Sequence, residues 1–271
     1  MSHSIPPLGC IGGGQMTEAF IRGLLTAQLL TPAQITVAEP DNSRCDYLTK
    51  TYGVQCTQDP GLLCSNSELL LVAVKPQVAI PVLEQYRPCI QQQHLVISIM
   101  AGISLASLTA VLSGPVRLIR VMPNIAVLVL AGASAYCANA EATDEDRQSA
   151  AAILSSVGTC TEVEEHLLDA VTGLSGSGPG YVLTFIEAMI DGGVLAGLPR
   201  SVAEQLALQT VYGSARLALT TGEHPAVLKA QVTSPGGTTI SGVQVLEQGG
   251  LRGMVMAAIK TAAERSRELG A

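Results

Sequence analysis

Short apolar runs alternate with helical patterns along the first half of the chain. Continuous runs rich in branched residues predict strands at Leu8–Ile11, Ile35–Ala38, Leu69–Val74, Leu95–Ile99 and Val116–Val121. Apolar positions three and four residues apart predict helices at Gln15–Ala27 and Arg44–Tyr52, and the capping residue Thr143 opens another that runs to about Ser156. Strands without polar alternation, separated by helices, are typical of a parallel sheet covered on both faces.

The second half of the chain reads differently, because the strand-like runs stop at about Glu165. Helical patterns follow at Pro179–Gly197, Pro199–Thr221 and Leu251–Leu269, with a shorter one after Thr238. The first of these is apolar nearly all round, which is typical of a helix buried on every side. We therefore expect an α/β domain at residues 1–164 and an all-helical domain at residues 165–271, with a partner subunit covering the apolar helices.

Composition narrows the class of protein. Of 271 residues, 48% are hydrophobic and 14% charged, which suits two domains with cores of their own. The formal net charge is -7 and Lys and Arg form no cluster, which disfavours a nucleic-acid-binding protein. The seven cysteines include no CxxC pair, so we expect reduced thiols in a cytoplasmic protein and no metal site. Residues 1–7 lack the pattern of a signal peptide, and polar residues break the uncharged stretch at 121–140, so no membrane segment is expected.

A glycine loop follows the first predicted strand and opens the first predicted helix. It comprises Ile11, Gly12, Gly13, Gly14, Gln15 and Met16. This is the place of the GxGxxG/A fingerprint, in which glycines allow a tight turn and a close approach to a pyrophosphate, and helix N–H groups attract it. Thr17 departs from the fingerprint, since it stands where Gly or Ala is usual at a close helix–strand contact. We expect the loop to bind a dinucleotide cofactor.

The end of the second predicted strand bears on the choice of coenzyme. Glu39 stands where an acid accepts hydrogen bonds from the ribose 2′-OH of NAD. Arg44, with Asn42 and Ser43 before it, could instead hold the 2′-phosphate of NADP, and Glu39 could be an ordinary solvated strand end. These residues leave NADH, NADPH and the use of both open.

Ligands of such sheets bind at the carboxyl ends of the strands. Two further predicted strands therefore end beside the same expected cofactor site. We expect backbone groups of Val74, Lys75 and Pro76 to line the cofactor, together with Ala101 and Gly102. Lys75 fits an ordinary solvated lysine equally well.

Two segments rich in glycine and hydroxyl groups precede helices in the second half. They are Thr172–Pro179 and Ser234–Thr239. Backbone N–H groups at the start of a helix bind anions without basic side chains, so either segment would suit a substrate carboxylate. Simple helix capping is the alternative interpretation of each.

Taken in order, these segments resemble the pyrroline-5-carboxylate reductases. The resemblance rests on IGGGQM, AVKP, MAG, RVMPN, TGLSGSGP and, above all, LKAQVTSPGGTTISGVQVLEQGG. It implies a Rossmann-type doubly wound parallel sheet followed by an all-α dimerisation domain. It also implies reduction of 1-pyrroline-5-carboxylate to L-proline, the last step of proline biosynthesis, by hydride transfer from NADPH, with NADH possible. Interleaved homodimers, often assembled into decamers, are the family's architecture.

The resemblance also assigns the residues that meet the substrate. Thr239 would hydrogen-bond the ring nitrogen, while Ser234 and the backbone of Gly237 and Thr238 would hold the carboxylate. No catalytic His or Cys is implied. The chain departs from the family pattern at Ile125-Ala126, usually Thr-Pro, and at Gly180, usually Ala.

Two other classes of protein fit parts of the pattern. A β-hydroxyacid dehydrogenase also pairs a dinucleotide-binding domain with a helical one, but it needs a catalytic lysine in the helical half. Lys229 and Lys260 are the candidates there, and neither lies in a glycine-rich loop. A nucleotide sensor without catalysis would bind the cofactor alone, and the intact Ser234–Thr239 segment argues against that class.

Overall fold

The computed structural model describes residues 5–270, which form two compact units. One unit runs to Ser177 and takes in the chain again from Thr261, and the other is Gly178–Lys260. The start of the N-terminal segment that lacks a signal-peptide pattern lies outside the described residues. The domain boundary expected between residues 164 and 165 stays a prediction, since the compact units do not test it.

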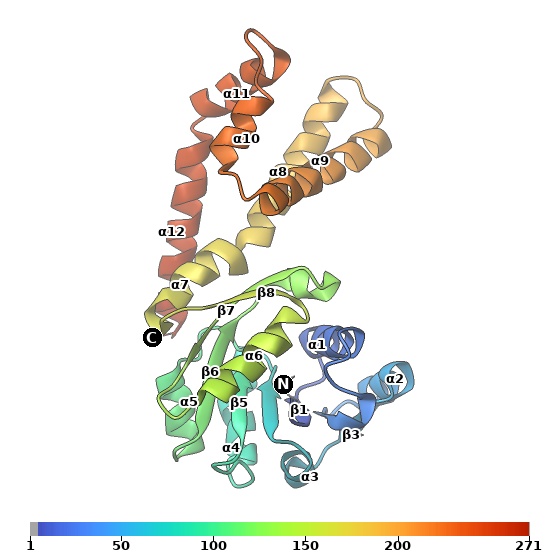
Figure 1. The fold of residues 1–271 in the computed structure, drawn as a ribbon, viewed down its shortest axis with the longest axis vertical. Coiled ribbons are helices and arrows are strands. Elements are labelled where there is room, and N and C mark those ends of the chain that lie inside the picture. The colour runs from blue at the N-terminus through green and yellow to red at the C-terminus, as the bar shows by residue number, and fades with distance from the viewer. Residues whose placement is uncertain (1–4, 271) are drawn as a thin grey trace. The chain divides into compact units, whose positions relative to one another are not determined.

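Eight strands of the described chain form one sheet in the order β3-β2-β1-β4-β5-β6-β7-β8 (Figure 1). Their bounds are β1 Leu8–Ile11, β2 Ile35–Ala38, β3 Gln55–Thr57, β4 Leu69–Val72, β5 Leu95–Ser98, β6 Arg117–Met122, β7 Gly132–Ala138 and β8 Gly158–Glu162. Strand β1 pairs in parallel with β2 on one side and β4 on the other, so the strand order reverses beside it. The predicted Rossmann-type, doubly wound sheet is confirmed.

Helices cover both faces of this sheet, which explains why its central strands are apolar throughout. Along β4, Leu69 and Leu71 belong to a buried cluster that includes residues of α1, α2 and α6. Leu70 and Val72 belong to a second cluster that includes residues of α3, α4 and α5. The bounds of these helices are α1 Gln15–Thr26, α2 Asn42–Tyr52, α3 Pro60–Ser65, α4 Ala79–Tyr86, α5 Leu105–Leu112 and α6 Asp144–Ser155.

Three strands lie outside the apolar runs that predict the other five. The edge strands β3 and β8 are partly exposed, so their residues need not be apolar. Strand β7 runs antiparallel to β6, although the pattern indicates a parallel sheet. The reason is the short connection at 123–131, since a parallel crossover needs about a dozen residues or more.

The rest of the described chain is helical, as the sequence predicts. The helices are α7 Leu168–Val171, α8 Gly178–Leu195, α9 Arg200–Thr221, α10 Pro225–Gln231, α11 Thr238–Gln248 and α12 Leu251–Gly270. Many large apolar side chains of the second unit are exposed within the single chain, among them Leu183, Leu206, Tyr212, Leu219, Val245 and Met256. Apolar surface of this extent is typical of a subunit interface. Each helix of the described residues is too short or too polar to cross a membrane.

The first of the two glycine- and hydroxyl-rich segments is largely helical. Thr172–Gly176 forms a π-helical segment directly after α7. The Thr172 hydroxyl donates to the Leu168 carbonyl at 2.8 Å, and the Ser177 N–H donates to the Thr172 carbonyl at 2.8 Å. Side-chain hydroxyl groups that donate to carbonyls of the preceding turn are compatible with a helix. The glycine and serine residues therefore do not end the helix here. The Ser177 N–H is therefore already paired, and residues 172–176 are helical.

The start of α6 tests how a cap contributes to stability. The Thr143 hydroxyl accepts a hydrogen bond from the Asp146 N–H at 3.2 Å, and the Asp146 carboxylate accepts one from the Thr143 N–H at 2.8 Å. We expect Thr143→Ala to lower the free energy of unfolding by about 1 kcal/mol. Thr143→Ser keeps the acceptor and should retain the stability of the parent. Urea unfolding followed by circular dichroism, at one protein concentration, measures both, and equal losses would contradict a role for the hydroxyl.

Candidate active site

The glycine loop joins β1 to α1 at the carboxyl edge of the sheet. Gly12 has φ +95°, a conformation that residues with a side chain rarely adopt. A Cβ at Gly12 would lie 3.0 Å from the Val74 side chain and 3.1 Å from the Ala73 carbonyl oxygen. Both the turn and the neighbouring strand end therefore require glycine here.

Gly14 is open where Gly12 is crowded. A Cβ at Gly14 would meet no atom of the described residues within 4 Å. Gly14 is also the N-cap of α1, and among the described residues no side chain caps this helix. The first N–H groups of α1 thus face open space, which is the arrangement that binds a pyrophosphate.

The departure at the third fingerprint position is accommodated inside the unit. Thr17 is fully buried, and its hydroxyl donates a hydrogen bond to the Gly12 carbonyl at 2.5 Å. A buried hydroxyl with a partner avoids the cost of an unpaired polar group. Thr17 therefore stabilises the glycine loop through this hydrogen bond.

A cavity of about 470 Å³ lies at the carboxyl ends of β1, β2 and β4. It unites several of the expected cofactor residues, namely Ile11, Gly12, Gly14, Glu39, Val74 and Lys75. Lys75 is exposed and precedes the short turn that begins at Pro76. This is the position where a doubly wound sheet binds its ligand.

Two further cavities are lined by most of the other expected residues. Gln15, Met16 and Ala101 line one of about 350 Å³, and Pro76, Ala101 and Gly102 line one of about 530 Å³. Every residue that lines them belongs to the first compact unit. Eleven of the predicted cofactor residues thus line three cavities, two of which share Ala101, whereas Gly13 and Arg44 line none of them.

Asn124 and Ile125 line the 350 Å³ cavity, although the sequence does not single them out as site residues. The Asn124 side-chain oxygen accepts from the N–H groups of Ala126 and Ala133, each at 3.2 Å, and its amide donates to the Ser175 carbonyl at 3.1 Å. The stretch RVMPN contains this asparagine, so the resemblance carried the signal without revealing its role. Ile125, which replaces the family's usual threonine, is 60% exposed beside the cavity.

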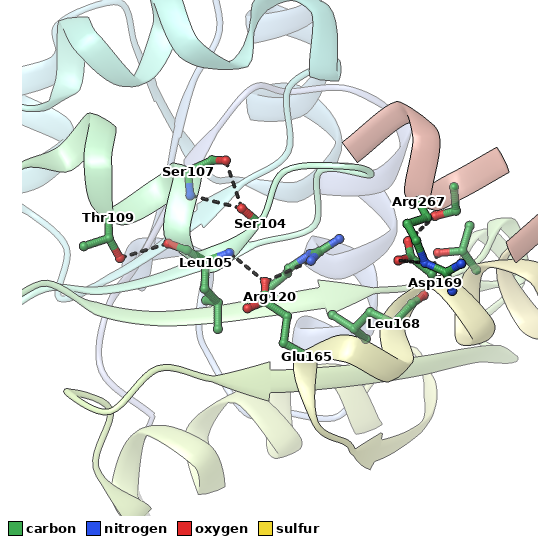
Figure 2. Close-up of polar contacts among 11 residues, drawn as sticks. Ser104, Leu105, Ser107, Thr109, Arg120, Glu165, Leu168, Asp169 and Arg267 are labelled. Atoms are coloured by element: carbon green, nitrogen blue, oxygen red, sulfur yellow. Dashed lines mark hydrogen bonds and ion pairs between the residues drawn. The ribbon is translucent and has the colours of Figure 1, made fainter. Parts of the chain in front are cut away.

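Polar contacts around Glu165 hold the turn that follows Ala101 and Gly102 (Figure 2). The Glu165 carboxylate accepts from the Leu105 N–H at 2.7 Å and pairs with Arg120 at 2.9 Å. These bonds fix the start of α5, the first helix after the turn. A side chain at the end of the sheet thereby positions a backbone segment of the cavity rim.

The last turns of α12 are fastened to the same compact unit. Asp169 accepts a hydrogen bond from the Ser266 hydroxyl at 2.7 Å, and Arg267 lies 3.9 Å from the same carboxylate (Figure 2). Leu269 follows and lines the cavity beside Gly102. The C-terminal helix thus contributes apolar surface to the rim, which no motif in the sequence indicates.

The four expected substrate residues lie together in one turn of the second unit. Gly236 has φ +66°, and the Gly237 N–H donates to the Ser234 carbonyl at 3.1 Å. Helix α11 begins at the next residue, Thr238, and among the described residues no side chain caps it. Thr239 is exposed in its first turn. The turn therefore presents hydroxyl groups beside the uncapped N–H groups of a helix, a combination suited to a carboxylate.

Other nucleophiles and cations of the chain lie away from these residues. All seven cysteines are free. Burial raises the pKa of the Cys10 thiol to about 12 and that of Cys137 to about 11, so neither forms a nucleophilic thiolate at neutral pH. Lys229 and Lys260 lie on α10 and α12, outside the turn at 234–239. Among the described residues, no group of His, Cys, Asp and Glu could hold a metal ion.

The two loop glycines allow cofactor binding to be separated from folding. Gly14→Ala should raise the dissociation constant of a nicotinamide dinucleotide about tenfold or more, because the added methyl occupies the space that the pyrophosphate needs. The free energy of unfolding should change by less than about 1 kcal/mol, since Gly14 is extended and uncrowded. Gly12→Ala should impair both stability and binding. Isothermal titration calorimetry and urea unfolding measure the two effects, and unchanged affinity in Gly14→Ala would contradict this placement of the cofactor.

Comparison with known proteins agrees with the geometry. The family model "Pyrroline-5-carboxylate reductase dimerisation" matches residues 165–269, and "NADP oxidoreductase coenzyme F420-dependent" matches residues 7–102. The pyrroline-5-carboxylate reductase of Synechocystis sp. is 49% identical over 263 residues, which are 97% of this chain and 98% of that protein.

Solved structures show the same likeness. A pyrroline-5-carboxylate reductase from Coxiella burnetii is 33% identical with a TM-score of 0.95, over 98% of this chain and 99% of that one. A Plasmodium falciparum pyrroline carboxylate reductase with NADP bound is 31% identical with a TM-score of 0.87, over 99% of both chains. The chain therefore belongs to the pyrroline-5-carboxylate reductase family.

Proposed function

We propose that this chain reduces 1-pyrroline-5-carboxylate to L-proline, the last step of proline biosynthesis, with the glycine loop holding the cofactor and the turn at 234–239 holding the substrate. The observation that carries the assignment of the substrate turn is the start of α11. This helix begins without a side-chain cap from the described residues, inside the stretch that most specifically resembles the family. Its free N–H groups suit the carboxylate of a cyclic imino acid.

The chain's own groups bind and orient the substrate. The Ser234 hydroxyl and the backbone of Gly237 and Thr238 hold the carboxylate, with the Gly237 N–H shared between the substrate and the Ser234 carbonyl to which it donates at 3.1 Å. The Thr239 hydroxyl hydrogen-bonds the ring nitrogen and so fixes the face of the imine. When bound, the reduced nicotinamide supplies the hydride to the carbon of the protonated imine, whose N–H then becomes that of the neutral amine. Orientation is the protein's main contribution to such a transfer, which agrees with a site built from backbone and hydroxyl groups.

The coenzyme set comprises the expected residues of the first unit. The pyrophosphate is bound by Ile11, Gly12, Gly13, Gly14, Gln15 and Met16. The adenosine lies near Glu39 and Arg44. The remaining part of the coenzyme is lined by Val74, Lys75, Pro76, Ala101 and Gly102. NADPH is the coenzyme, with NADH possible, and the Plasmodium falciparum relative has been solved with NADP bound. The free cysteines support a reducing compartment, and we place the protein in the cytoplasm.

The chain carries the family's dimerisation region and forms a homo-oligomer. Its finer architecture is an interleaved homodimer, assembled further into a decamer. The support is the apolar surface of the second unit, where Leu183 is 60% exposed, Leu219 84% and Met256 71% in the single chain. Side chains of this kind need cover from water, and a second copy of the same helices provides it.

Replacing the Thr239 hydroxyl tests the substrate assignment. Thr239→Ala should lower kcat/KM for the imine about a hundredfold, because a hydrogen bond to the reacting nitrogen is lost. Thr239→Ser keeps the hydroxyl and should lie within about tenfold of the parent. Absorbance of the reduced nicotinamide, with purified protein and 1-pyrroline-5-carboxylate, measures turnover. Unchanged turnover in Thr239→Ala, with coenzyme affinity also unchanged, would remove this residue from the mechanism.

A charge in the apolar surface tests the oligomer. Leu183→Glu on α8 should weaken subunit association about thirtyfold or more, because an unpaired carboxylate would be buried between subunits. Gln92→Glu adds the same charge at an exposed polar position of the first unit, away from the apolar surface, and serves as the control. Light scattering after size-exclusion chromatography gives the molar mass of both variants. An unaltered oligomer in Leu183→Glu would place the interface on other residues.

A further inference from the structure

Glu39 is held in a fixed position at the carboxyl end of β2. One carboxylate oxygen accepts a hydrogen bond from the Gly13 N–H at 2.8 Å, and the other accepts one from the Asp41 N–H at 3.1 Å. Glu39 also lines the 470 Å³ cavity together with Pro40 and Gln58. An acid fixed at this point of a dinucleotide-binding sheet can accept hydrogen bonds from the ribose 2′-OH of an adenosine.

Arg44 is the nearby cation that could favour a 2′-phosphate, but its Nε and one of its two terminal nitrogens are committed to the glycine loop and to Glu18. Its Nε donates to the Gly13 carbonyl at 2.6 Å, and one terminal nitrogen donates to the Gly14 carbonyl at 3.2 Å. The same nitrogen lies 2.6 Å from the Glu18 carboxylate. The guanidinium also lies 5.1 Å from the centre of the Tyr47 ring. Arg44 therefore braces the glycine loop from behind.

Glu18 holds Arg44 in this position. Its second oxygen accepts hydrogen bonds from the hydroxyls of Tyr47 at 2.9 Å and Tyr52 at 2.8 Å. Burial opposes the charge on Glu18, but the hydrogen bonds from Arg44 and the two tyrosines outweigh it and lower the pKa of this carboxyl. The carboxylate is thus charged at neutral pH and neutralises the arginine beside it.

The charged side chains around the end of β2 consequently sum to a negative charge, while Lys75 lines the same cavity from the end of β4. Arg44 and Glu18 cancel, while Glu39 and Asp41 use their carboxylates to accept hydrogen bonds from backbone N–H groups. Hydrogen bonds from the side chain and N–H of Ser43 lower the pKa of Asp41, which keeps it ionised. A 2′-phosphate would bring about two more negative charges into this surrounding.

We propose that Glu39 sets the coenzyme choice of this chain: its carboxylate receives an unphosphorylated adenosine ribose and opposes a 2′-phosphate, while Glu18 withholds Arg44 from that phosphate. NADH is then a full coenzyme beside NADPH, and NADPH binds against a penalty that one side chain imposes. The catalytic part of this assignment rests on the proposed function, whereas coenzyme affinity can be measured without turnover.

Removing the Glu39 charge tests the assignment. Glu39→Gln can retain the bond to the Gly13 N–H, and it should tighten NADPH relative to NADH about tenfold or more. Asp41→Asn removes one charge two residues away while keeping a good N-cap for α2, and should change that ratio by less than about threefold. Calorimetric dissociation constants and kcat/KM for both coenzymes give the ratio twice. An unchanged ratio in Glu39→Gln, or an equal shift in Asp41→Asn, would overturn the assignment.

The role of Arg44 is tested by a double-mutant cycle. Arg44→Ala should weaken both coenzymes together, because the loop loses its brace, and a selective loss of NADPH would overturn the withheld state of this arginine. Glu18→Gln should release Arg44 and tighten NADPH about threefold or more, and the gain should vanish in Glu18→Gln/Arg44→Ala. Absence of that gain would equally count against it. Circular dichroism of each variant shows whether the fold is retained.

The two measurements separate this assignment from the proposed function. Expected shifts in binding without turnover of 1-pyrroline-5-carboxylate would refute the reaction and leave the role of Glu39 intact. Normal turnover of 1-pyrroline-5-carboxylate with an unchanged ratio of coenzyme affinities would support the reaction and refute the role of Glu39.

Discussion

The narrow turn between β1 and α1 is the constraint on which the rest of the first unit depends. Gly12 must adopt φ +95° there with the Val74 side chain and the Ala73 carbonyl in direct contact, and Thr17 supports the turn through its hydroxyl. Because β1 lies between β2 and β4, the ends of both neighbouring strands meet this turn. The uncapped helix start, the acid at Glu39 and the cavity at the strand edge all follow from that placement.

The central sheet and the long helices could be predicted from the sequence because burial on both faces imposes a uniform apolar pattern. Strands β1 and β2 have the predicted bounds, β4 and β5 end two residues and one residue earlier than predicted, and β6 is shifted by one residue at both ends. The edge strands β3 and β8 do not show this apolar pattern. Each has a neighbouring strand on one side only, and their side chains are partly exposed. Antiparallel β7 depends on the length of a connection, which a search for apolar runs does not weigh.

Local composition predicted the local structure of some segments of the candidate site but not that of others. Most of the expected cofactor residues line cavities, because glycine spacing after a strand encodes backbone geometry directly. The segment at 172–179 has an equally loop-like composition, yet its first residues are helical, since Thr172 and Ser175 bond back to carbonyls one turn earlier. Contacts between distant side chains left no mark in the sequence. Only the structure reveals that Arg44 pairs with Glu18. The same holds for the hydrogen bonds of Asn124 to three separate backbone groups.

An acidic chain that binds anionic ligands must do so mainly through its backbone. The formal net charge is -7, and the starts of α1 and α11 offer N–H groups where basic side chains would otherwise be needed. Such sites attract a pyrophosphate or a carboxylate through short-range dipoles, whose effect fades within a turn of the helix. A further phosphate on the adenosine ribose would depend on side chains rather than on these N–H groups. Because Arg44 is paired with Glu18, the proposed assignment leaves the carboxylate of Glu39 to decide the choice of coenzyme.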